Sequence, residues 1–344
     1  MLWLAPQVRT PMALGLSQLS SDAIDEHISQ SYRAGSTSPS PVLHQNSLDE
    51  AITAMQQAVR LTPDDHPNKP GRLSNLGNAF RRRFERLGNV ADLDEAIMMM
   101  HPAVRLTPDG HPSKPRYLSN LGTSFHSRFE RLGDVIDLDE AITVMQQAVR
   151  LTPGGHPNKP GWLNNLGMSF RSRFKRFGDV VDLDEAIMVM QQAVRLTPGG
   201  HPDKPVCLNN VGMFFQSRFE RLGNVVDLDE AITVMQQAVR LTPDVHLDKP
   251  GRLSNLGISF QSRFDRLGDV VDLDNAITVM QQAVHLTPNG HPDKPAYLNS
   301  LGISFSHRFE LLGDPAIPDQ DGTDKGKPST SQQVRNIISQ HTLH

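Results

Sequence analysis

The sequence predicts an all-α superhelix of six helix pairs, and three observations support this fold class. One phrase recurs with a period of 45 residues, and periods of this length are typical of solenoid proteins. Each copy contains two stretches whose apolar residues are spaced three and four apart, which indicates amphipathic helices. Each copy also has a proline or a glycine where these helices should end, as at Pro153 and Gly178. The leucines that open the six copies are Leu48, Leu93, Leu138, Leu183, Leu228 and Leu273.

The composition excludes several classes of function. The chain has 344 residues and a formal net charge of −4, with acidic and basic residues intermixed. Because no basic stripe could follow a phosphate backbone, we expect no nucleic acid partner. Cys207 is the one cysteine, which excludes a disulfide framework within the chain, and no Asn-x-Ser/Thr acceptor occurs. No basic leader with a long apolar run is present, so we expect a cytoplasmic protein with no membrane partner.

The repeats divide the chain into three parts. Residues 1–45 form an N-terminal segment that is partly disordered or a degenerate cap helix, with a short helix possible from Ser21 to Gly35. Residues 46–314 form the repeat array. Residues 315–344 are polar and rich in proline and glycine, which is typical of a disordered tail. An alternative for the tail is a weak amphipathic turn around Val334 and Ile338 that covers the open end of the array.

The first helix of each copy is typified by residues 138–151, in which Leu138, Ile142 and Met145 share one face. Asp137 and Glu140 form an acidic variant of the capping box, so we expect the helix to start there. The first copy has the standard form of this box, Ser47 and Glu50.

The second helix is predicted from about Pro160 to Phe177, with proline in the first turn, where its missing amide costs little. Gly167 lies at the edge of the apolar stripe, and a glycine in mid-helix costs about 1 kcal/mol in propensity. Its recurrence in every copy indicates that a neighbouring helix packs closely there. Gly178 should end the helix in a left-handed conformation. The stripe consists of Leu163, Leu166, Phe170, Phe174 and Phe177.

The phrase from Leu163 to Phe170, LNNLGMSF, matches the tetratricopeptide signature, and Ala186, Met190 and Pro198 supply its second half. The chain therefore resembles tetratricopeptide repeat (TPR) proteins, with KPGWLNNLGMSFRSRFKRFG as an A helix and LDEAIMVMQQAVRLTP as a B helix. The period exceeds the common TPR length of about 34 residues. It is most similar to the long repeats of kinesin light chains and of fungal arrays that precede CHAT peptidase domains, although no CHAT domain follows here.

An asparagine precedes the Leu-Gly pair in five copies, with Ser300 in the sixth. In the kinesin-light-chain-like arrays, such asparagines form a ladder that binds the backbone of an extended peptide, and the resemblance implies the same role here. A carboxamide suits it, because it offers a donor and an acceptor together. The alternative is that each asparagine bonds a neighbouring helix or water. The candidate residues are Asn75, Asn120, Asn165, Asn210 and Asn255.

Two further A-helix positions vary between copies. One is occupied in order by Asn78, Thr123, Met168, Met213, Ile258 and Ile303, and the other by Arg81, His126, Arg171, Gln216, Gln261 and Ser306. Apolar residues at an outward position predict a binding strip, and the alternative is that they pack against the next repeat. We therefore add five residues to the peptide-binding candidates, namely Met168, Met213, Ile258, Arg81 and Arg171.

Three other repeated residues have structural interpretations. A recurring arginine, typified by Arg83, lies on the core side and needs a partner. The recurring aspartate typified by Asp49, or a loop carbonyl, can supply it. The histidines typified by His66 stand one per repeat, too far apart to share a zinc ion, so we expect loop hydrogen bonds. Cys207 lacks a dedicated base.

These residues predict a protein-interaction scaffold that binds a peptide or partner protein along the groove lined by the A helices. No catalytic residue, metal site or cofactor is expected, so we do not expect an enzyme. One alternative is a self-assembling structural array, because no B helix follows Phe309 and an apolar face stays open for end-to-end stacking. Another is the regulatory half of a peptidase system whose catalytic part is a separate chain.

Overall fold

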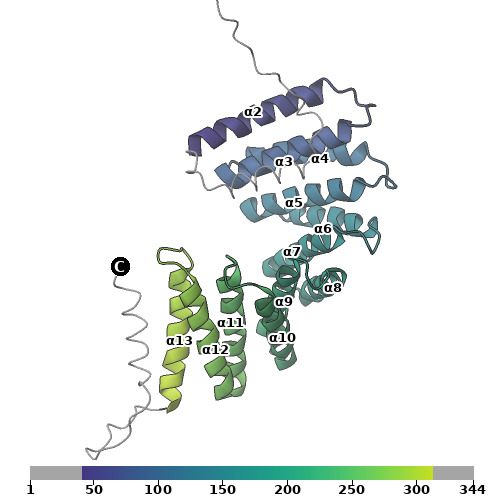
Figure 1. Ribbon diagram of the computed structural model, residues 1–344. Coiled ribbons are helices and arrows are strands. Elements are labelled where there is room, and N and C mark those ends of the chain that lie inside the picture. Colours follow the sequence, from purple (N-terminus) through teal and green to yellow (C-terminus); the bar gives the residue numbers. More distant parts are fainter. Residues whose placement is uncertain (1–40, 313–344) are drawn as a thin grey trace, which may run out of the picture. The chain divides into compact units, whose positions relative to one another are not determined.

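The computed structural model describes residues 41–312, with side chains from Leu48 to Leu311. The short helix expected at 21–35 and the expected tail at 315–344 lie outside the described residues. Within 41–312 the regular structure consists of twelve α-helices, which confirms the predicted all-α fold of six helix pairs (Figure 1).

The helices fall into two units, one up to Thr107 and one from Pro108. The first unit contains α2 (Pro41–Arg60), α3 (Lys69–Leu87) and α4 (Ala91–Arg105). The second contains α5 (Lys114–Leu132), α6 (Val135–Arg150), α7 (Lys159–Phe177), α8 (Val180–Leu196), α9 (Lys204–Leu222), α10 (Val225–Leu241), α11 (Lys249–Leu267), α12 (Val270–Leu286) and α13 (Lys294–Leu312). The A helices are thus α3 and the other odd-numbered helices, and the B helices are the even-numbered ones.

Long and short connections alternate along the chain. Residues 133–134 alone join α5 to α6, whereas residues 151–158 join α6 to α7. Within the second unit an A helix packs most closely on the B helix that follows it, as α9 does on α10, and that B helix then packs on the next A helix, as α10 does on α11. The short connection makes the A and B helices an antiparallel hairpin, and this hairpin is the unit that repeats.

The predicted helix starts of the B helices were wrong by a few residues. Helix α6 begins at Val135, and Asp134 caps it from an extended backbone conformation by accepting a hydrogen bond from the amide of Ile136 at 3.0 Å. Asp137 is already in the first turn and is buried. In the first copy α2 begins at Pro41, so Ser47 lies inside the helix and cannot cap it. A cap requires non-helical backbone, and the residue after the preceding helix's glycine provides it.

The A helices follow the prediction closely. Helix α7 ends at Gly178 with φ 74°, the left-handed conformation that was expected. Gly167 touches the next helix, because a Cβ built on it would lie 2.8 Å from Cγ of Met190. Leu163, Leu166 and Phe170 are buried as the stripe predicted. Phe177 is the exception at 57% exposed, since it is the last residue of the helix.

Four of the core-side arginines each bind two aspartates, of which the sequence indicated one; they are Arg83, Arg173, Arg218 and Arg263. Arg263 donates through Nη1 to Asp229 at 2.6 Å, the recurring aspartate that was expected. It also makes a two-pronged contact with Asp272, through Nε at 2.8 Å and Nη2 at 2.6 Å. These hydrogen bonds, foremost the one to Asp272, outweigh burial and raise the pKa of Arg263. Through these two aspartates, Arg263 joins the A helix α11 to the B helix that follows it, α12, and to the B helix that precedes it, α10.

The loops between repeats are held by a histidine and a lysine. Nδ1 of His246 accepts a hydrogen bond from the amide of Asp248 at 3.1 Å, and the same bond forms at each of the six histidines, as expected. The buried Lys249 donates to the carbonyls of Val239 at 2.8 Å and Thr242 at 2.7 Å. A cation at a helix C-terminus satisfies its last carbonyls and complements the helix dipole. Each repeat thereby closes on the one before it.

Candidate functional site

Two rows of polar contacts join neighbouring A helices in the second unit. In α9, Asn209 accepts a hydrogen bond from Asn255 of α11 at 3.1 Å, and Gln216 donates to Ser262 of α11 at 3.0 Å. On the other side of α9, Asn210 donates to Asn164 of α7 at 2.8 Å. One row consists of the asparagine contacts, and the other contains the contact from Gln216 to Ser262, about two helical turns further along the A helices.

The five predicted asparagines are all half-buried on this face. Asn210 and Asn255 each use one amide hydrogen to bond the asparagine of the preceding A helix. This is the contact with a neighbouring helix that the sequence left open as the alternative to peptide binding. Each of these asparagines keeps further hydrogen-bonding capacity, because a carboxamide has two donors and two acceptor lone pairs.

The variable apolar position lies midway between the two rows. At about 100° per residue, Met213 falls between Asn209 and Gln216 on one flank and Asn210 on the other. Met168 and Met213 are half-buried and also pack against the core, as the alternative interpretation expected. Ile258 is 42% exposed and Ile303 46% exposed. We call the residues Met168, Met213, Ile258 and Ile303 the apolar strip.

The two predicted arginines have protein partners. Arg81 makes an ion pair with Glu85, one turn on in the same helix. The guanidinium of Arg171 lies 5.9 Å from the ring centroid of Phe214 in α9, a cation–π contact. Burial lowers the pKa of Arg171, and Glu220 acts in the opposite direction. Both arginines therefore contribute to packing, and neither is simply a free cation on the surface.

The residues equivalent to Arg171 in other copies complete the second row. Nε2 of His126 lies 3.0 Å from Oγ of Ser172, and Nε2 of Gln261 lies 2.8 Å from Nδ1 of His307. Histidine and glutamine thus fill the same structural role in different copies. Burial lowers the pKa of His126, which favours the neutral ring.

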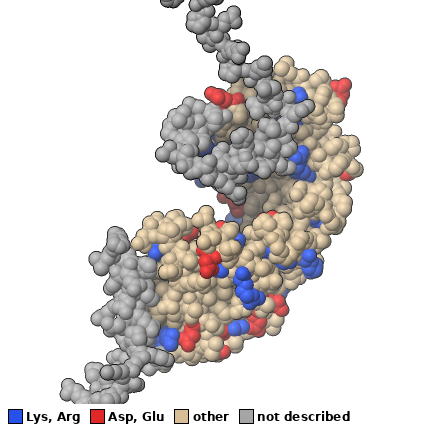
Figure 2. All heavy atoms as spheres, in the orientation of Figure 1, with Lys and Arg blue, Asp and Glu red and all other residues tan. Residues whose placement is uncertain are grey.

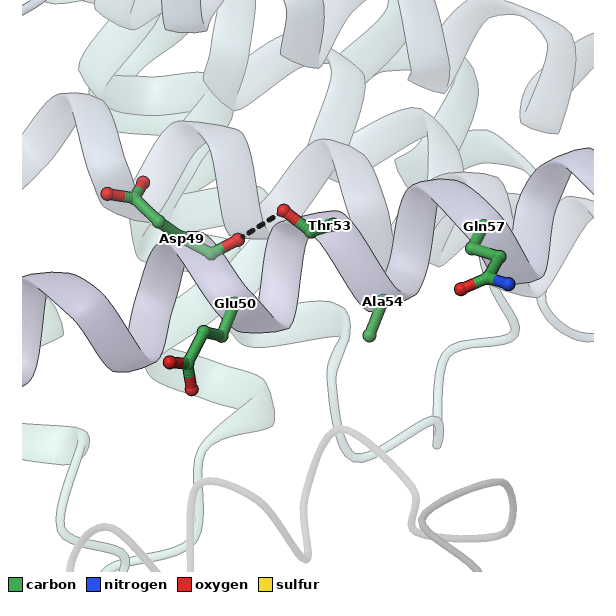
Figure 3. Close-up of a pocket in the computed structure, with 5 residues that line it drawn as sticks. All are labelled: Asp49, Glu50, Thr53, Ala54 and Gln57. Carbon is green, nitrogen blue, oxygen red and sulfur yellow. Dashed lines mark hydrogen bonds between the residues drawn. The ribbon is translucent and has the colours of Figure 1, made fainter.

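The rest of the described surface has mixed charge and a hollow. Lysine and arginine are interspersed with aspartate and glutamate over the face in Figure 2. A hollow of about 490 Å³ along α2 is lined by Asp49, Glu50, Thr53, Ala54 and Gln57 (Figure 3). The carboxylate of Asp49 there is 2.8 Å from Arg83, so it is committed to an ion pair. The lining residues that the structure describes all belong to α2.

Cys207 is buried, and burial raises the pKa of its thiol, so the thiolate is disfavoured. No group of three or more histidine, cysteine, aspartate or glutamate side chains among the described residues could hold a metal ion. Across residues 41–312, every helix is too short or too polar to cross a membrane.

Two functional parts of the repeat were missed at the sequence level. The buried aspartates that chelate the core-side arginines are Asp92, Asp137, Asp182, Asp227 and Asp272. The buried lysines that close the loops include Lys69, Lys114, Lys249 and Lys294. The lysine recurs in all six copies and the aspartate in five, with Ser47 in the first, and this recurrence is the signal that could have identified them.

Comparisons with solved structures bear on the fold. The chain is similar to BtubC (BKLC) from P. vanneervenii, with a TM-score of 0.51 and 15% identity over 82% of this chain and 99% of that one. This likeness and the repeated A–B hairpin with its Leu-Gly contact identify the architecture. The fold is a tetratricopeptide-like solenoid.

Two other TPR structures are also similar. A kinesin-light-chain-type protein of nearly identical TPR-like repeats from Podosopora anserina matches with a TM-score of 0.47 and 16% identity, over 64% of this chain and 96% of that one. The TPR protein TTC0263 from Thermus thermophilus matches with a TM-score of 0.43 and 19% identity, over 67% and 98%. No protein-family model and no curated protein matches the chain.

Proposed function

We propose that the chain is a protein-interaction scaffold that binds a peptide or partner protein along the A-helix face of its second unit. The observation that carries this proposal is the apolar strip. Ile258 and Ile303 are more than two-fifths exposed, and Ile258 lies between the Asn255–Asn209 contact and the Gln216–Ser262 contact, both of which join α11 to α9. Apolar side chains at the centre of a polar-edged surface are the usual anatomy of a binding site.

The polar rows give the strip a rigid setting. Bonds from Asn210 to Asn164 and from Gln216 to Ser262 fix the spacing of neighbouring A helices. A ligand would therefore meet side chains that are already ordered, and pre-organisation reduces the entropic cost of binding. The remaining hydrogen-bonding capacity of Asn210 and Asn255 lies beside the strip, where it can bond the backbone of an extended peptide.

Affinity capture with matched variants tests the proposal. One bait carries Met213→Ser and Ile258→Ser on the A-helix face. The control bait carries Val226→Ser and Val271→Ser, which change side chains on the B helices that are 60% and 62% exposed. Partners that bind through the strip should be captured by the native chain and the control and lost by the first bait. Equal capture by all three baits would refute the location of the site.

A second bait set addresses the asparagines. Replacing Asn120, Asn165 and Asn210 by alanine should weaken capture of the same partners if the carboxamides bond peptide backbone. If that variant stays folded and binds every partner with unchanged strength, the asparagines act only between helices.

A further inference from the structure

The last described A helix, α13, lacks the contact that every other A helix makes with its B helix. A Cβ built on Gly77, Gly122, Gly167, Gly212 or Gly257 would come within 2.8 Å of the methionine of the B helix that follows. A Cβ built on Gly302 of α13 would meet nothing within 4 Å. The place that a B-helix methionine takes elsewhere is therefore open on α13 in the described part of the chain.

Two more features of α13 indicate that a following B helix is missing from the described part of the chain. Nε of Arg308 is buried without a hydrogen-bond partner, whereas Nε of Arg263 donates to a B-helix aspartate. Phe309 is 51% exposed, and the equivalent Phe264 is half-buried. Arg308 does keep its contact with the preceding B helix, at 2.8 Å from Asp274. One side of α13 is thus packed as in the other repeats, and the other side is not.

At the other end of the described residues, α2 is a B helix with the complementary deficiency. It carries the phrase LDEAI from Leu48 to Ile52, identical to that of α10, and then Met55 at the position of the packing methionine. Leu48, Ala51, Met55 and Ala58 are only half-buried, and Ala54 is exposed. In α6 the equivalents of Leu48, Ala51, Met55 and Ala58 are at most 2% exposed. The face of α2 that would pack on an A helix is therefore incompletely covered.

We propose that α2 of a second copy of this chain docks on α13 as its B helix. Met55 of one copy would lie against Gly302 of the other, and Phe309 would become half-buried, as Phe264 is. The contact would continue an interface that the fold already repeats five times, with the LDEAI phrase in the same positions in four of the five B helices and Asn275 replacing its glutamate in α12. Because it joins two different surfaces, it is heterologous and can add further copies in a row.

One residue sets the expected strength of this contact. Ser47 stands in α2 where the other B helices have the buried aspartate that chelates the core-side arginine. Docking would therefore bury Phe309 and fill the space at Gly302 without the ion pair to Arg308. The contact should be weaker than the internal A–B contacts, so association should depend on protein concentration.

Sedimentation of the full chain, from low micromolar to several hundred micromolar, tests the proposal. The average mass should rise with concentration beyond that of a dimer. Gly302→Leu should abolish this rise, since the added side chain occupies the methionine's place, and Ala54→Arg should abolish it from the other side. Both positions are open in the single chain, so both variants should keep the native helical content. A native chain that is monomeric throughout, or a Gly302→Leu variant that associates like the native chain, would overturn the proposal.

Mixing the two variants gives the sharpest outcome. Each blocks one of the two surfaces and leaves the other intact, so an equimolar mixture should form one-to-one dimers and no longer species. A mixture that stays monomeric while the native chain associates would show that another surface is responsible. If instead the native chain is monomeric and Gly302→Leu lowers its unfolding midpoint, a segment of the same chain covers α13, and the second copy is not the occupant.

Discussion

The same substitution should have opposite effects at two equivalent glycines, Gly212 and Gly302. At Gly212 an alanine Cβ would lie 2.5 Å from Cγ of Met235, far below van der Waals contact, and 3.2 Å from the carbonyl oxygen of Ala231, a tight contact. At Gly302 the same Cβ meets nothing within 4 Å. Both residues are inside A helices, so the change in helix propensity is the same for both.

The magnitudes follow from two terms. Alanine is favoured over glycine inside a helix by about 1 kcal/mol. Overpacking a close contact costs about 1 to 3 kcal/mol, and the low end applies where the neighbour can move. Gly302→Ala should therefore stabilise the protein by up to about 1 kcal/mol, whereas Gly212→Ala should be neutral or destabilise it by up to about 2 kcal/mol.

Urea unfolding followed by circular dichroism measures both effects. Self-association stabilises the folded state, so the midpoints of the two variants should be compared at a concentration where the chain is monomeric. The stability of a repeat array is a sum of local terms, so each midpoint then reports the local effect of its substitution. The midpoint should rise for Gly302→Ala and fall for Gly212→Ala. If Gly212→Ala raises the midpoint as much as Gly302→Ala does, glycine is not needed for close packing of the A and B helices.

Three further changes test the contacts of the repeat. Asp227→Asn, which leaves Arg218 without its 2%-exposed partner carboxylate, should destabilise the protein by about 3 kcal/mol. Asp184→Asn, at the 56%-exposed partner of the same arginine, should cost under about 1 kcal/mol. Equal losses of unfolding free energy for Asp227→Asn and Asp184→Asn, measured by urea unfolding, would contradict the conclusion that the buried aspartate is the stronger partner of Arg218. Burial lowers the pKa of His126 below 6.5, so the unfolded chain binds the proton more readily than the folded chain. The contribution of the neutral ring to stability is therefore present above about pH 6.5 and is lost as the pH falls below that value. His126→Gln should reduce this acid-side loss in midpoints measured from about pH 8 to about pH 5, and an unchanged pH profile would argue against a neutral buried ring. Pro102 lies inside α4 at a position where the other copies have glutamine. Pro102→Gln should raise the thermal midpoint, with a gain in stability of about 1 to 3 kcal/mol. No gain would mean that α4 already accommodates the proline.

The period and the apolar spacing were sufficient to predict the helices, because both depend on local sequence. Gly178 and the stripe from Leu163 to Phe170 were confirmed for the same reason. The histidine contacts were also predictable, since each joins residues two apart in a loop. These features need no knowledge of how one repeat sits on the next.

The arginine partners show where sequence reasoning stopped. Asp137 and Asp139 flank Leu138, and helical periodicity places them equally far from it on either side. Only the position of the preceding A helix determines that Asp137 is buried against Arg128, at 2.6 Å. The buried lysines were missed for a similar reason, because a lysine at a helix start looks solvent-exposed until the loop before it is folded.

The asparagines illustrate the same limit within the candidate site. The sequence predicts that Asn210 lies on the A-helix face, but whether it contacts a ligand or a neighbouring helix depends on the distance between A helices. The structure adds the bond to Asn164. It also moves the centre of the proposed site from the asparagines to the apolar strip between the two rows.

The most direct test of the proposed function compares one substitution on two faces of the same repeat. Ile258→Ser lies on the A-helix face and Val271→Ser on the following B helix, and both side chains are more than two-fifths exposed. Burial of an aliphatic side chain contributes about 1.5 kcal/mol or more, which is about tenfold in Kd. Titration of a captured partner should show Ile258→Ser raising Kd about tenfold and Val271→Ser leaving it unchanged. An unchanged Kd for Ile258→Ser, or an equal loss for both, would contradict binding along the A helices.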